Sequence, residues 1–149
     1  MSAPIDPASS RRTLVSAGVL IVMIAIVHLA AIVIGPSAFV YLDAAELAVM
    51  IEQGSSLPTV LTLAVTAVLG VFALYAFSGA GLVQRLPQLH AGLLVIGAIF
   101  TFRGLGVFWF GYLVLAGAPN AIPREIGFSL LSLVLGLLVL AGRRGLPPG

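Results

Sequence analysis

The chain has 149 residues, of which 60% are hydrophobic and only 8% are charged. Soluble globular domains carry about 25% charged residues, so this composition excludes a water-soluble enzyme, a disordered tail and a nucleic-acid-binding protein. The formal net charge of +2 comes from seven arginines and five acids, too few for a basic surface that binds nucleic acid. Cysteine is absent, which excludes disulfides and thiolate metal sites. The composition predicts an integral membrane protein.

Four apolar stretches have the length of about 20 residues that a membrane-spanning helix needs. They cover residues 14–34, 58–77, 89–112 and 123–141. Each stretch is continuously apolar rather than alternating, which favours helices over the strands of a β-barrel. The loops between them are short enough to join neighbouring helices, so the sequence predicts an all-α protein, an antiparallel four-transmembrane-helix bundle.

Residues 37–53, between the first two spans, predict an additional helix. Asp43 and Glu46 are three residues apart, so they share a face, and Gly54 is a suitable residue for a helix C-terminus. With Glu52, the segment carries three acids, which makes it a poor spanning segment. We therefore expect an amphipathic helix that lies at the outer membrane interface.

The arginines predict the topology. Five of them fall on one side of the four predicted spans (Arg11, Arg12, Arg85, Arg143 and Arg144), whereas Arg124 falls on the other side with four of the five acids (Asp43, Glu46, Glu52 and Glu125). Cytoplasmic loops are enriched in basic residues. We therefore expect cytoplasmic tails at residues 1–13 and 143–149 around a transmembrane domain at 14–142. Arginine without lysine, together with abundant Ala, Gly, Leu and Val, indicates a bacterial protein of the inner (plasma) membrane.

Small residues recur at helical spacing within the spans, which indicates close helix packing. The third span carries Gly97, Gly104 and Gly111 at seven-residue steps, and the fourth carries Ser129, Ser132 and Gly136. A substrate path along these faces is the alternative. An aromatic cluster at residues 108–112 predicts the outer interfacial belt.

Polar residues inside the spans form the candidate site. Arg103 and His28 each lie about 14 residues into a span, about 21 Å from the cytoplasmic edge at about 1.5 Å per residue. Glu125, Asp43 and Glu46 lie at the outer side. We hypothesise that these five residues form an intramembrane polar cluster. The alternatives are an arginine that snorkels or is paired for packing, and a histidine that is hydrogen-bonded structurally.

No catalytic motif is present: the sequence lacks Gly-x-Ser-x-Gly, a phosphate loop and His-Glu-x-x-His. His28 and His90 lie near opposite depths, so they cannot share a metal or a haem within the chain. We expect no catalytic residues, no metal site and no cofactor, although an enzyme is not excluded.

The favoured function is an accessory, assembly or regulatory subunit of a membrane complex. Its expected partners are the lipid bilayer and either a membrane protein or further copies of the chain. One alternative is a small oligomeric transporter of an anionic or lipid substrate that uses Arg103 and His28. In its four short spans the chain resembles the small multidrug resistance transporters, but their membrane-embedded glutamate in the first span has no counterpart here, where that span carries His28. The other alternative is a membrane enzyme that acts on a lipid or quinone.

Overall fold

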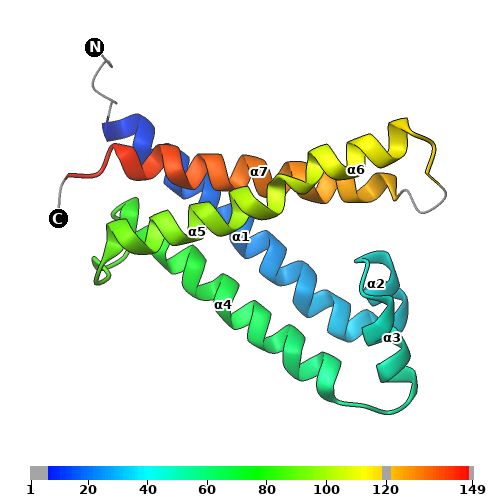
Figure 1. Ribbon diagram of the computed structural model, residues 1–149. Coiled ribbons are helices and arrows are strands. Elements are labelled where there is room, and N and C mark those ends of the chain that lie inside the picture. The colour runs from blue at the N-terminus through cyan, green and yellow to red at the C-terminus, as the bar shows by residue number, and fades with distance from the viewer. Residues whose placement is uncertain (1–6, 119–121, 148–149) are drawn as a thin grey trace. The chain divides into compact units, whose positions relative to one another are not determined.

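The protein is all-helical. The computed structural model describes residues 7–118 and 122–147, and no β-strand occurs within these ranges (Figure 1). In chain order the helices are α1 (Pro7–Ile34), α2 (Pro36–Tyr41), α3 (Ala45–Glu52), α4 (Leu57–Gly79), α5 (Leu89–Gly104), α6 (Gly106–Leu115) and α7 (Pro123–Arg144).

Four helical segments are long and apolar enough to cross a membrane. They are Ala8–Ile34, Leu57–Gly79, Leu89–Leu115 and Pro123–Arg144, with 27, 23, 27 and 22 residues. Each exceeds the length of about 20 residues that a bilayer core requires. The four predicted spans are thus confirmed as apolar helices of spanning length, and the chain has the makeup of a multi-pass membrane protein. The first helix begins before residue 14 and includes Arg11 and Arg12.

Two predicted helices are interrupted. The single helix expected over residues 37–53 is wrong: α2 and α3 are separate short helices, and the chain turns between them at Asp43, whose φ of 61° is left-handed. The third span is divided between α5 and α6 at Leu105. There the Leu105 amide bonds both Thr101 O (3.0 Å) and Phe102 O (3.2 Å), so the helix tightens locally without a change of chain direction.

The chain divides into two compact units, one formed by Met1–Gly18 with Leu74–Gly149 and the other by Val19–Ala73. In the smaller unit, α2 and α3 pack on each other and on the end of α1. Ala31, Phe39 and Ala48 are the buried centre of this apolar cluster. Burial of Phe39 and Ala48 against α1 therefore explains why the acidic segment folds back rather than continuing as one helix.

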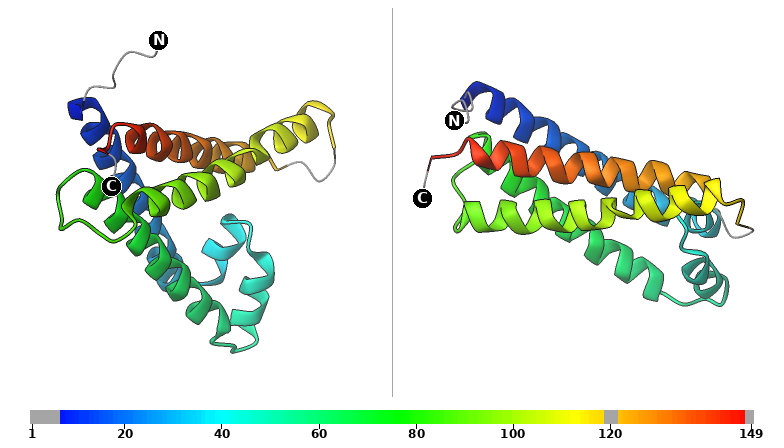
Figure 2. Two further views of the ribbon diagram at one scale, coloured as in Figure 1. Left: turned by 60° about the vertical axis from the view of Figure 1, so that its left-hand side comes forward. Right: turned by 45° about the horizontal axis from the view of Figure 1, so that its top comes forward.

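In the larger unit, α5 and α6 run along α7 (Figure 2). A Cβ atom at Gly97 would lie 2.6 Å from the Leu140 side chain, and one at Gly104 would overlap the backbone of Leu133. From Gly97 to Gly104 the chain advances seven residues along α5, while the residue in contact on α7 moves back by seven, from Leu140 to Leu133. The two helices are therefore antiparallel. Gly136 faces the Thr101 amide across the same contact. The packing interpretation is thus confirmed for Gly97, Gly104 and Gly136, whereas no atom lies within 4 Å of a Cβ added at Gly111.

The ends of four helices converge in this unit on the fully buried side chain of Leu14, near the start of α1. A Cβ atom would lie 2.8 Å from Leu14 at Gly79, near the end of α4, and 2.6 Å from it at Gly142, near the end of α7. Leu93, near the start of α5, also borders Gly79. The arginines of these helix ends and of the intervening loop consequently gather at one end of the unit.

The α5–α7 contact predicts opposite effects for two glycine substitutions. Gly104→Ala places a methyl group against the backbone of Leu133, which cannot move as a side chain can. We expect a loss of about 1–3 kcal/mol of stability. At Gly111, also helical, no atom lies within 4 Å of an added Cβ, so Gly111→Ala should be neutral or stabilising by up to about 1 kcal/mol. Thermal unfolding in detergent measures both, and equal effects would contradict the assigned contact.

Candidate functional site

Asp43 has a structural role at the end of α2. The Asp43 amide bonds Val40 O (3.3 Å), and the Ala44 amide bonds Phe39 O (2.8 Å). These two bonds and the positive φ form the motif that commonly ends a helix, in which glycine usually holds the left-handed position. Asp43 is exposed, so its carboxylate lies at the surface of the smaller unit.

Glu46 is exposed in the first turn of α3, where a negative charge is favourable to the helix dipole. His28, half-buried in α1, bonds within its own helix: its Nδ1 lies 2.8 Å from Ile24 O. A carbonyl oxygen can only accept, so Nδ1 is the donor in this bond. This bond matches the structural alternative for His28.

Arg103 and Glu125 have different environments in the larger unit. Arg103 is exposed near the end of α5, and its guanidinium has no hydrogen bond or ion pair with a described residue of its unit. Glu125, in the first turn of α7, is only 5% exposed. A negative charge in the first turn of a helix is favourable to the helix dipole. The two side chains therefore form no pair.

The predicted cluster of five residues stays a prediction, because its members belong to two different units. His28, Asp43 and Glu46 are in the smaller unit, and Arg103 and Glu125 are in the larger one. Within either unit, the described residues contain no group of three histidine or acidic side chains able to hold a metal ion.

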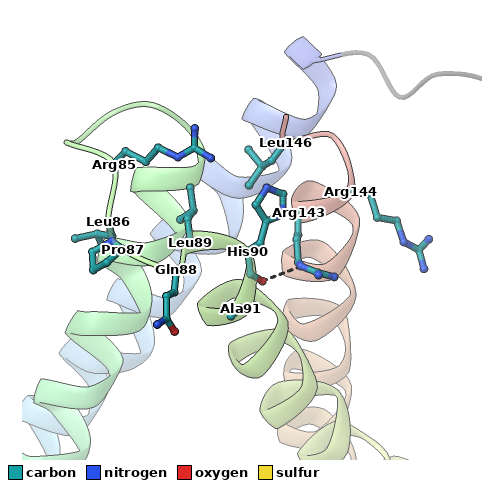
Figure 3. A pocket seen from close by; sticks show the side chains of 10 residues that line it. All are labelled: Arg85, Leu86, Pro87, Gln88, Leu89, His90, Ala91, Arg143, Arg144 and Leu146. Carbon is teal, nitrogen blue, oxygen red and sulfur yellow. Dashed lines mark hydrogen bonds between the residues drawn. The ribbon is translucent and has the colours of Figure 1, made fainter. Parts of the chain in front are cut away.

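A basic groove that the sequence did not predict lies at the converging helix ends (Figure 3). It has a volume of about 1060 Å³ and is lined by Arg85 of the α4–α5 loop, His90 of α5, and Arg143 and Arg144 of α7. The Arg143 Nε donates to His90 O at 2.8 Å, and the His90 Nε2 donates to Pro147 O at 2.8 Å. These bonds tie the start of α5 to the end of α7.

The loop that carries Arg85 is held by Ser78, at the end of α4. The buried Ser78 hydroxyl donates to Gln84 O at 3.0 Å and accepts from the Leu86 amide at 2.9 Å. These two bonds bracket Arg85 and so fix the backbone on either side of it. The Tyr75 hydroxyl adds a bond of 3.3 Å to Pro87 O.

The groove concentrates positive charge. Besides the three arginines, it includes the start of α5, where Gln88 provides no side-chain cap for the first amides. The N-terminus of a helix bears partial positive charge. No ion pair links Arg85, Arg143 or Arg144 to a described residue of the unit. These arginines share one predicted membrane side. That pattern predicts topology, and it does not by itself indicate a groove.

Comparison of the chain with protein families, with curated proteins and with solved structures finds no match. The functional argument therefore rests on the residues themselves.

Two substitutions at Asp43 separate the contribution of the backbone conformation to stability from that of the carboxylate. Asp43→Val places a β-branched residue in the left-handed conformation and should cost about 1–2 kcal/mol. Asp43→Gly removes the same carboxylate but favours the conformation, so it should be more stable than Asp43→Val by about 1–2 kcal/mol. Unfolding in detergent compares the two, and a similar loss in both would show that the carboxylate, not the backbone, matters.

Proposed function

We propose that this protein is an accessory, assembly or regulatory subunit of a membrane complex, and that Arg103 pairs with a carboxylate on a membrane-spanning helix of its partner. The observation that carries the proposal is the exposed Arg103 guanidinium, which has no described partner in its own unit. An accessory role requires such a contact rather than a catalytic site.

The depth of Arg103 makes its charge costly in lipid. It lies about 14 residues after Leu89, so about 21 Å along a span whose bilayer core is about 30 Å thick. An arginine near the centre of a spanning helix costs about 2.5–3.5 kcal/mol on insertion scales. Snorkelling recovers part of this cost, whereas a partner carboxylate at the same depth neutralises the charge.

The surface around Arg103 is apolar. Ile99 and Phe102 are exposed on α5, and Phe102 is 80% exposed. Further along, Trp109 and Tyr112 of α6 are exposed, with ring centroids 6.3 Å apart. Such aromatic residues commonly mark the membrane interface. A partner helix on this face would meet lipid-like side chains and a single cation, which favours a partner that is apolar except for one acid.

In the proposed arrangement, the four spanning helices form an antiparallel bundle in a bacterial inner membrane, with both chain ends cytoplasmic. Contacts at Leu14 bring the start of α1 to the end of α7. The arginine-rich helix ends therefore meet at one end of the larger unit, as the positive-inside rule requires for a shared cytoplasmic side.

Substitution of Arg103 tests the accessory role. In native membranes, Arg103→Leu should weaken copurification of the partner by about 100-fold or more, because an unpaired buried charge costs about 3–5 kcal/mol. Arg103→Lys should retain partial association, and Arg124→Leu is the charge-matched control. Mass spectrometry of proteins bound to the tagged chain measures the effect, with helix content checked by circular dichroism.

Three results would contradict the proposal. They are the absence of any specific partner in the parent, unchanged recovery with Arg103→Leu, and self-association as the only contact that depends on Arg103. Anion flux by the purified chain in proteoliposomes, if abolished by Arg103→Leu, would instead assign a transporter.

The lack of cysteine makes the topology testable without background labelling. Gln84 in the α4–α5 loop and Ala116 after α6 are both exposed. On intact cells, a membrane-impermeant thiol reagent should label the Ala116→Cys variant and should label Gln84→Cys only after permeabilisation. The reverse pattern, or equal labelling of both, would contradict the proposed orientation.

A further inference from the structure

We propose that the basic groove at the converging helix ends binds the phosphate of an anionic phospholipid. Arg85, Arg143 and Arg144 line one concavity with the first residues of α5, whose amides have no side-chain cap. Figure 3 shows that the Arg144 side chain extends from α7 on the side away from Arg85. Guanidinium groups and helix N-terminal amides are both strong donors to phosphate oxygens. The groove thus offers the two kinds of donor that phosphate recognition commonly combines.

The arginines are only partly accounted for by the helix they flank. Arg143 and Arg144 are in the last turn of α7, where positive charge complements the helix dipole. Arg85 is in a loop before the positive end of α5, so its charge has no such compensation from that helix. An anion in the groove would neutralise Arg85 together with the other two.

The contacts of Arg143 leave donors for a ligand. Its bond to His90 O uses Nε, so the two terminal nitrogens of the guanidinium hold donors in a fixed plane. No hydrogen bond is found between the Arg85 or Arg144 side chain and a described residue of the unit. The bonds of Ser78 on either side of Arg85 hold the loop in place before a ligand arrives.

The location and the apolar lining favour a lipid over a soluble anion. The groove also includes Leu86, Leu89 and Leu146, beside its basic residues. It opens at the ends of two segments of membrane-spanning length, Leu89–Leu115 and Pro123–Arg144, where phospholipid headgroups would lie. Basic pockets between spanning helices at the cytoplasmic side are suited to anionic headgroups. The leucines would then contact the glycerol and the upper acyl chains.

The test is lipid binding by the purified full chain in neutral detergent, measured by native mass spectrometry and by thermal stabilisation. The parent should bind phosphatidylglycerol saturably and prefer it over phosphatidylcholine. Arg85→Gln should weaken phosphatidylglycerol binding about fivefold and Arg85→Gln with Arg144→Gln about 30-fold, from about 1 kcal/mol per basic side chain. Arg124→Gln, at the opposite end of α7, is the matched control and should bind as the parent does.

The experiment includes two further comparisons, one with soluble anions and one of the folding of the variants. Inorganic phosphate or glycerol phosphate at the same concentration should stabilise far less than the lipid; equal stabilisation would overturn the lipid assignment and leave a soluble anion. Because Arg85 is exposed on a loop, its single variant should keep the parent's helix content and melting temperature without lipid. Unchanged phosphatidylglycerol affinity in a folded Arg85→Gln variant and in the double variant would overturn the proposal altogether.

Discussion

The larger unit depends on the close approach of α5 and α7. Lipid provides no hydrophobic force that brings helices together, so packing must do so, and Gly97 and Gly104 allow near-contact with the backbone of α7. This contact also fixes the rotation of α5. With about 100° between successive residues, the glycines face α7 while Ile99 and Arg103 turn away from it. The exposure of Arg103 is thus a consequence of glycine packing rather than an independent feature.

The same contact determines what meets at the helix ends. Gly104 opposes Leu133 and Gly97 opposes Leu140, and continuing this antiparallel register brings His90 to Pro147, where the hydrogen bond is found. Any residue just before α5 must then lie near the last turn of α7. Arg85 and Arg143 are distant in sequence, yet the register places both at one groove. The pairing of α5 with α7 therefore explains both features: it brings the arginines of the groove together, and it turns Arg103 away from α7.

Much of the fold could be predicted from the sequence because its signals are local. A run of apolar residues sets helix length, and glycine permits the left-handed turn that ends a helix, as at Gly54 after α3. The break at Asp43 lacked such a signal, since aspartate adopts this conformation less often than glycine. It depends on the burial of Phe39 and Ala48 against α1, which is a tertiary effect. The charges of the groove residues are visible in the sequence, but the register of α5 against α7, which brings them together, is not.

Depth and rotation explain the different fates of the candidate residues. The rise of about 1.5 Å per residue gives the depth of Arg103 from sequence alone, but rotation about the helix axis depends on contacts between helices. Rotation separates Arg103, exposed, from Glu125, buried in the first turn of α7. Depth then determines which counter-charge each arginine can meet. Lipid phosphates are abundant at the membrane surface and absent from its core, so arginines at the helix ends can be neutralised by lipid. In the proposed membrane arrangement Arg103 lies deeper, so the carboxylate that we propose as its counter-charge would belong to a protein.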